Sequence, residues 1–93
     1  FLLTRSSFLG QQRYASHSWS GDVVSTWEVM RKQLAAGLNY SLCGIPYWNT
    51  DLGGFFAWKY NNNVNNIAYH ELHVRWYQWG CFNPLCAHTI LVR

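Results

Sequence analysis

The sequence feature that most constrains the fold is a short strand-like run that ends in a glycine-aspartate turn and leads directly into a helix. The run covers residues 14–19, and Gly21 and Asp22 form the turn. Ser25 is a favourable N-cap and Glu28 follows three residues later as the partner in a capping box, so a helix is predicted to begin here. A strand followed at once by a helix is a βα unit, which places Asp22 at the carboxyl end of the strand.

The same alternation of strands and helices continues along the chain. The helix that begins at Ser25 is predicted to end at Gly37, and residues 67–79 predict a second amphipathic helix that Gly80 stops. Three further strands are predicted at 1–4, 38–43 and 82–85. Strands that alternate with helices favour a parallel sheet, and a complete (β/α)₈ barrel needs ~250 residues. The sequence therefore predicts an α/β fold, the C-terminal half of a TIM barrel with roughly strands 5 to 8, and one partial catalytic domain over residues 1–93.

Composition excludes several classes of partner. The formal net charge is +3, but the basic residues form no stripe, which argues against nucleic acid. No apolar run approaches the ~18 residues of a membrane-spanning helix, so no membrane partner is predicted. Only 12% of the residues are charged, which suggests surfaces that neighbouring parts of a larger protein cover. No cofactor and no metal are expected, because zinc-site spacing is absent from the one candidate cluster, His70, His73, Cys81, Cys86 and His88.

Polar side chains follow the predicted strands at the points where the strands end. Arg5, Asp22, Asp51 and His88 fall in four successive loops of this kind. In a (β/α)₈ barrel these loops share one face, so the four side chains are expected to converge on one pocket. Trp19 adds an aromatic wall beside Asp22, and a carboxylate next to an aromatic face is a common arrangement for gripping and cleaving sugars. The sequence therefore favours a carbohydrate site.

Six segments make the chain recognisable, and together they are highly specific. They are Thr4-Arg5-Ser6-Ser7-Phe8, Trp19-Ser20-Gly21-Asp22, Thr26-Trp27-Glu28, residues 31–39, residues 44–56 and residues 75–82. The longest of them reads Gly-Ile-Pro-Tyr-Trp-Asn-Thr-Asp-Leu-Gly-Gly-Phe-Phe. On these segments the chain resembles glycoside hydrolase family 31, the α-glucosidase and α-xylosidase family, over nearly its whole length. The Gly-Ile-Pro-Tyr-Trp run resembles the α-xylosidase branch more closely.

The resemblance implies a role for each matching residue. Asp22 would be the general acid/base, whose pKa must be raised by burial and a neighbouring charge. Arg5 would bind sugar hydroxyls near the scissile bond, and Asp51 would bind hydroxyls of the sugar before that bond. The implied pocket walls are Trp19, Trp48 and Phe55. His88 is expected to reach the sugar, although residues 84–89 depart from the family's Pro-x-x-Arg-x-His-Gly pattern.

The resemblance also implies what this chain lacks. A retaining glycosidase needs two carboxyl groups, a nucleophile and an acid/base, and the family's nucleophilic aspartate lies on an earlier strand. The expected function is therefore that of a fragment of a retaining α-glycosidase, which hydrolyses terminal α-linked glucose or xylose from oligosaccharides. The fragment would carry the acid/base but not the nucleophile. It would be inactive alone and would need the rest of the barrel.

Other interpretations of the same residues stay open at this stage. Asp22 could be a helix N-terminal charge, Asp51 a turn residue before two glycines, and Arg5 a member of a structural ion pair. The whole chain could be a non-catalytic carbohydrate-binding module or an aromatic-rich interaction domain. Binding modules are usually β-rich, so the alternation of strands and helices counts against that class.

Overall fold

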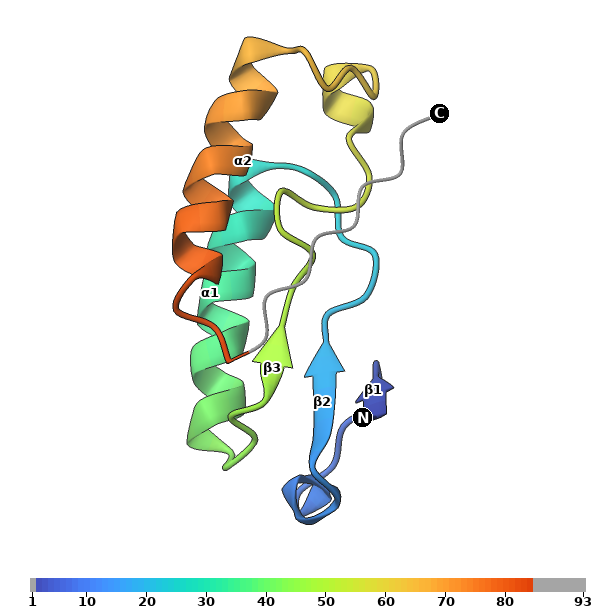
Figure 1. Cartoon of the computed structure of the whole chain (residues 1–93), viewed down its shortest axis with the longest axis vertical. Helices are drawn as coiled ribbons and strands as arrows, with labels where there is room; N and C mark the ends of the chain where they lie inside the picture. The colour runs from blue at the N-terminus through green and yellow to red at the C-terminus, as the bar shows by residue number, and fades with distance from the viewer. Residues whose placement is uncertain (1, 85–93) are drawn as a thin grey trace.

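The computed structural model describes residues 2–84, and within them a three-stranded parallel sheet lies beside two helices (Figure 1). The strands are β1 (Leu2–Thr4), β2 (Ser16–Trp19) and β3 (Trp48–Asn49). The helices are α1 (Trp27–Leu42) and α2 (Ile67–Gly80), with short 3₁₀ helices η1 (Gln11–Tyr14) and η2 (Trp58–Tyr60). No helix in residues 2–84 combines the length and the apolar character needed to cross a membrane.

The sheet confirms the predicted parallel arrangement but has fewer strands than predicted. The strand order is β1-β2-β3, and Ser18 pairs with both Thr4 and Trp48. Residues 82–84 form a turn and a bend instead of the predicted fourth strand, and residue 85 lies outside the described residues. The described sheet therefore has three strands, and it does not confirm the prediction of strands 5 to 8 of a barrel.

Helix α1 begins one residue later than predicted. Its N-cap is Thr26, whose hydroxyl oxygen accepts a hydrogen bond from the Val29 N–H at 3.2 Å. The predicted cap, Ser25, is fully buried, and its N–H donates instead to the Phe56 carbonyl at 2.9 Å. Glu28 does not close a capping box but forms an ion pair with Lys32 one turn along the helix, at 2.7 Å. Ser25 is thus used for tertiary pairing rather than for capping.

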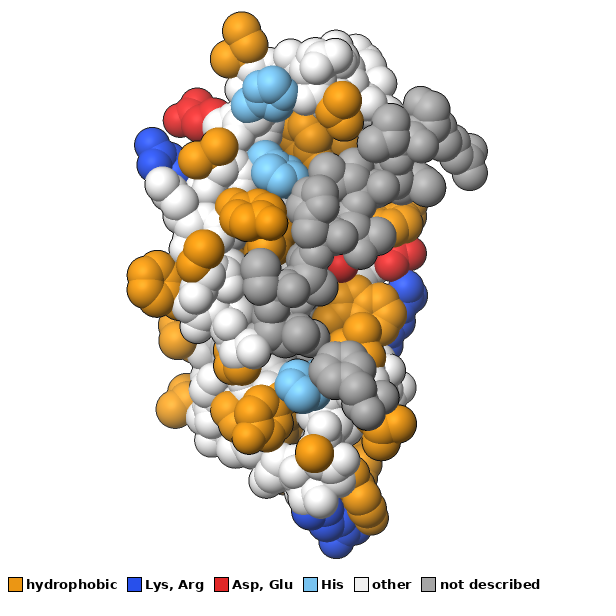
Figure 2. Space-filling view, in the orientation of Figure 1, with side chains coloured by type: hydrophobic (Ala, Val, Ile, Leu, Met, Phe, Trp, Pro, Cys, Tyr) orange, Lys and Arg blue, Asp and Glu red, His pale blue; other side chains and the backbone are white. Residues whose placement is uncertain are grey.

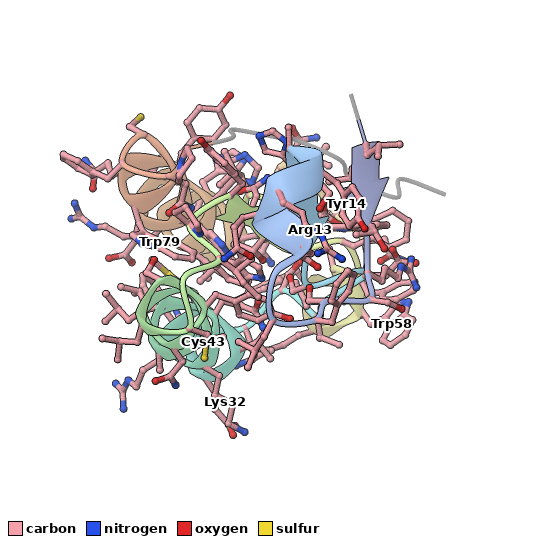
Figure 3. All side chains as sticks on the ribbon, turned by 90° about the horizontal axis from the view of Figure 1, so that it is seen from below. Arg13, Tyr14, Lys32, Cys43, Trp58 and Trp79 are labelled. Atoms are coloured by element: carbon pink, nitrogen blue, oxygen red, sulfur yellow. The ribbon has the colours of Figure 1, made fainter. Side chains whose placement is uncertain are left out.

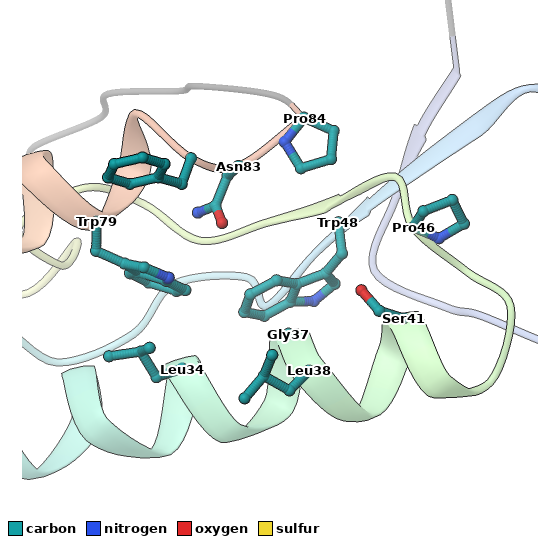
Figure 4. A pocket seen from close by; sticks show the side chains of 10 residues that line it. Leu34, Gly37, Leu38, Ser41, Pro46, Trp48, Trp79, Asn83 and Pro84 are labelled. Atoms are coloured by element: carbon teal, nitrogen blue, oxygen red, sulfur yellow. The ribbon is translucent and has the colours of Figure 1, made fainter.

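The predicted helix end at Gly37 and the predicted strand at 38–43 are both wrong, because α1 continues through Gly37 to Leu42. The strand lies instead at Trp48–Asn49. Figure 4 shows the reason for the glycine, since the Trp48 indole lies directly over Gly37. A Cβ atom on Gly37 would come within 2.8 Å of the Trp48 ring. Gly37 is therefore required for close packing of helix against strand and does not terminate the helix.

The second helix confirms the sequence interpretation more closely. Helix α2 begins at its predicted first residue, with Asn66 as N-cap. It ends at Gly80, where a Cβ atom would come within 2.3 Å of Leu52. The core joins the helices to the loop after β3. It consists of Met30, Leu52, Ala57, Tyr60, Tyr69, Leu72 and Trp76. The loop that carries Asp51 is thus packed against α2.

Because Trp48 packs on Gly37, a glycine-to-alanine substitution in this helix is predicted to lower the stability of the protein instead of raising it. Glycine to alanine inside a helix normally stabilises a protein by ~0.5–1 kcal/mol. Gly37→Ala should instead destabilise this chain by ~1–3 kcal/mol, because the new methyl group overlaps the indole. Urea unfolding followed by tryptophan fluorescence measures the change.

The matched control is Gly37→Ala in a Trp48→Phe background, where the ring atoms that meet the methyl group are absent. In that background Gly37→Ala should be neutral or stabilising. Equal destabilisation in both backgrounds would contradict the packing role of Gly37.

Candidate active site

The carboxyl ends of the three parallel strands lie at one edge of the sheet, and the candidate site is built there. Arg5 directly follows β1, Trp19 is the last residue of β2, and Asp22 lies three residues beyond it. Asp51 follows β3 by two residues. Parallel pairing therefore places side chains from distant parts of the sequence at one edge, as the sequence predicted.

Arg5, Trp19 and Asp22 form a contiguous cluster. The Arg5 Nη2 atom donates to Asp22 Oδ1 at 2.7 Å, and the guanidinium carbon lies 4.8 Å from the centroid of the Trp19 ring. Gly21 lies beneath the guanidinium and has a φ of +76°. A Cβ atom at this position would come within 3.2 Å of Arg5 Nε. The ion pair considered as an alternative for Arg5 is therefore present, and its partner is the candidate acid/base itself.

The surroundings of Asp51 raise the pKa of its carboxyl group. Asp51 is 4% exposed, and its pKa is raised from 3.8 to about 6, mainly by burial and then by the negative charge of Asp22. A hydrogen bond from the Trp19 side chain and the charge of Arg5 act in the opposite direction on that pKa. The raised pKa that the sequence argument requires of Asp22 is expected in the complete enzyme, and it stays a prediction.

Backbone hydrogen bonds join the loop that carries Asp22 to the loop that carries Asp51. The Phe55 and Phe56 N–H groups donate to the Val23 carbonyl at 2.7 and 3.1 Å, and Ser25 N–H donates to the Phe56 carbonyl. Gly54 has φ +80°, and a Cβ atom there would meet the Ser25 backbone at 2.8 Å. Only glycine fits that approach, so the two loops form one unit.

Of the other predicted site residues, Phe55 lies in the joined loops and Trp48 lies against α1. Phe55 is half-buried in the joined loops, and its ring meets Phe56 edge-on at 4.8 Å between centroids. Trp48 is 4% exposed and packs on α1, so the structure does not bring it to the cluster around Asp22. Its ring lines a cavity of about 330 Å³ beside α1, which neither Asp22 nor Asp51 lines. His88 lies outside the described residues.

Sequence reasoning missed three polar residues that support the cluster from behind. Ser18 on β2 is fully buried, and its hydroxyl is 2.7 Å from both Ser7 Oγ and Gln11 Nε2. Ser7 and Gln11 fall in a stretch that reads as a polar loop, and no motif separates them from ordinary surface residues. The one available signal is that Ser7 belongs to the segment that also contains Arg5.

Comparisons with known proteins give matches over most of the chain. The sequence model of the glycosyl hydrolases family 31 TIM-barrel domain matches residues 1–89. The chain is 54% identical over 84 residues to an α-xylosidase from Saccharolobus solfataricus, covering 90% of this chain and 11% of that protein. It is 51% identical over 83 residues to an uncharacterized family 31 glucosidase from Pseudescherichia vulneris, covering 89% of this chain and 15% of the relative.

A solved structure gives the same result for the fold. The crystal structure of a family 31 α-xylosidase from a soil metagenome, complexed with xylose, superposes with a TM-score of 0.86 at 44% sequence identity. The match covers 95% of this chain and 12% of that one. The chain therefore spans only a small part of the length of the relatives it matches.

The raised pKa of Asp51 predicts a stability change with pH. Between about pH 4 and pH 6 the folded chain holds a proton that the unfolded chain has released, so stability falls as pH rises through this range. Asp51→Asn removes the cost of charging this buried carboxyl group. The free energy of unfolding of the variant should therefore exceed that of the unsubstituted chain by up to ~3 kcal/mol above pH 6. Below pH 4 the two should converge.

Urea unfolding in dilute solution between pH 3.5 and pH 7.5 measures the difference, with Glu71→Gln on the exposed surface of α2 as the control. The control should follow the unsubstituted chain at every pH. A difference between Asp51→Asn and the unsubstituted chain that does not change with pH would contradict the buried environment of Asp51.

Proposed function

Because this chain belongs to glycosyl hydrolase family 31, we propose that it is a segment of a retaining α-glycosidase and supplies the acid/base Asp22. The substrate is an oligosaccharide with a terminal α-linked xylose or glucose. Relatives that are named α-xylosidase or glucosidase support a glycosidase function in general. The observation that carries the assignment of Asp22 is the Arg5–Trp19–Asp22 cluster beside Asp51.

The exposure of Asp22 supports the acid/base proposal. Its side chain is 33% exposed, so a glycosidic oxygen and then a water molecule can reach it. In the first step Asp22 donates a proton to the leaving oxygen while a carboxylate from outside these residues bonds to the anomeric carbon. In the second step Asp22 takes a proton from water, and that water displaces the enzyme carboxylate from the sugar. Both steps together consume one water and regenerate Asp22.

Arg5 and Asp51 are proposed to bind hydroxyl groups of the sugar. A guanidinium has five N–H donors, and the Arg5 side chain is 59% exposed while it pairs with Asp22 through Nη2. Donors on its other edge can therefore meet hydroxyl oxygens. The Asp51 carboxylate can accept hydrogen bonds from hydroxyl groups, and such bonds strengthen at the transition state.

The aromatic rings of Trp19 and Phe55 are proposed to form walls of the pocket. Trp19 lies under the Arg5 guanidinium, and Phe55 follows the turn that Asp51 begins. We leave Trp48 out of the proposed substrate-binding set, because its ring is committed to packing on Gly37. His88 stays in the proposal on the family resemblance alone.

The rest of the barrel is the proposed partner of this segment. Large hydrophobic side chains are exposed over much of the molecule, and Figure 2 shows many of them on one face with few acidic groups. Leu42, Ile67 and Phe82 are each more than 80% exposed. Surfaces of this kind are usually covered by neighbouring structure. We therefore expect the isolated 93-residue chain to associate and to lack hydrolytic activity.

The acid/base role predicts how a substitution of Asp22 depends on the leaving group. The experiment uses a chimera in which this chain replaces the matching segment of the Saccharolobus solfataricus α-xylosidase. Asp22→Ala should lower kcat/KM by ~10²–10⁴ for a substrate whose leaving group needs protonation. The loss should be much smaller for the first step with an activated aryl α-xyloside, whose leaving group departs without a proton.

Steady-state and burst kinetics with a graded set of aryl α-xylosides measure the dependence. Glu28→Ala, on the exposed first turn of α1, is the control and should leave both substrates unchanged. An equal loss for good and poor leaving groups would remove Asp22 from the acid/base role.

A further inference from the structure

The connection between β1 and β2 contains no α-helix, although a helix usually makes the crossover between parallel strands. Residues 5–15 form this crossover, and its one helical element is η1, at the end where β2 begins. Figure 3 shows η1 with Arg13 and Tyr14 at this end of the sheet. Arg5 is the first residue of the crossover, so whatever fixes the crossover also fixes the point from which the Arg5 side chain extends.

Within residues 2–84, apolar packing contributes little to holding this crossover. Phe8 is 55% exposed and Leu9 is 75% exposed, although both are large hydrophobic residues. A cavity of about 270 Å³ separates them from Tyr40 and Ile45, at the carboxyl end of α1 and just beyond it. A segment that leaves its own apolar side chains in solvent gains little from the hydrophobic effect.

Buried polar contacts hold the crossover instead. Gln11 is 2% exposed, and its Nε2 atom donates to the hydroxyl oxygen of the fully buried Ser18 at 2.7 Å. Ser7 Oγ lies 2.7 Å from the same oxygen, and Gln11 Oε1 accepts from the Phe8 N–H at 3.2 Å. We call Ser7, Gln11 and Ser18 the serine-glutamine clasp. Each buried polar atom in it has a partner, which is the condition for such groups to stabilise a fold.

The clasp and the candidate site lie on opposite faces of the same strand. Ser18 directly precedes Trp19 in β2, and successive side chains of a strand point to opposite faces. The clasp therefore pins Ser7 behind β2, while Arg5, two residues before Ser7, reaches over Trp19 to Asp22 in front. Only Ser6 lies between Arg5 and Ser7, so a clasp that holds Ser7 also restricts the backbone from which the Arg5 side chain extends.

We infer that the serine-glutamine clasp is a positioning device for Arg5, which holds the guanidinium over Trp19 and against Asp22. Ser7, Gln11 and Ser18 are positioning residues, because they act on a sugar only through Arg5. The consequence for hydrolysis rests on the proposed function, whereas the positioning itself does not. Small misplacements of a substrate-binding group are costly in enzymes, so a loosened crossover lowers turnover without removing a contact to the sugar.

The first arm of the test measures the Arg5 side chain by NMR in the chimera, because the isolated chain is expected to associate. The Trp19 ring shifts the Arg5 Nε–H proton upfield while the guanidinium stays over it. Ser18→Ala and Ser7→Ala should move this signal toward its unstructured position and speed its exchange with water at least fivefold. Ser6→Ala, at the exposed neighbouring position, is the matched control and should change neither property.

The second arm measures kinetics in the chimera with an aryl α-xyloside. Ser18→Ala and Ser7→Ala should lower kcat about five- to tenfold with KM within twofold, whereas Ser7→Thr keeps the hydroxyl and should restore kcat to within twofold. An unchanged Arg5 signal with only a lower melting temperature would overturn the inference, since the clasp would then be merely structural. A loosened Arg5 with unchanged kcat would support the clasp and count against the proposed role of Arg5.

Discussion

Three backbone hydrogen bonds between residues 23–25 and 55–56 are the contacts on which the candidate site depends. They join the loop that follows β2 and carries Asp22 to the loop that follows β3 and carries Asp51. Gly54 makes the joint possible, because any side chain there would meet the Ser25 backbone. The parallel sheet brings the loops to one edge, and these hydrogen bonds then fix how the two carboxyl groups face each other.

The electrostatics of the site follow from that fixed geometry. Asp51 is buried next to Asp22, and burial and like charge both raise its pKa. Arg5 and Trp19 offset part of this cost, because the guanidinium pairs with Asp22 and the Trp19 side chain hydrogen-bonds to Asp51. Two acidic groups are therefore held together by one cation and one aromatic ring. Such an arrangement suits a site in which a proton must move.

The sequence predicted the features that depend on local pattern. Helix α2, the parallel order of the strands, and the gathering of Arg5, Asp22 and Asp51 at one edge all follow from short-range periodicity and turn residues. The strand predicted at 38–43 is wrong because the prediction ends the helix at Gly37, whereas α1 continues through it to Leu42.

Features that depend on contacts between distant residues could not be predicted in this way. Gly37 looks like a helix stop until Trp48 is seen above it. Ser18 and Gln11 look like surface residues until their hydrogen bond is seen. In each case the deciding partner lies on another element, and its position is set by the fold as a whole.

Hydrolysis of an aryl α-xyloside and an aryl α-glucoside by the isolated chain and by the chimera tests the central claim most directly. The claim is that this chain supplies the acid/base and sugar-binding side of a site whose nucleophile lies elsewhere. The account predicts activity for the chimera and none for the purified chain, although both contain Asp22. Activity of the chain alone that disappears in Asp22→Asn would contradict it, and so would a folded chimera that hydrolyses neither substrate.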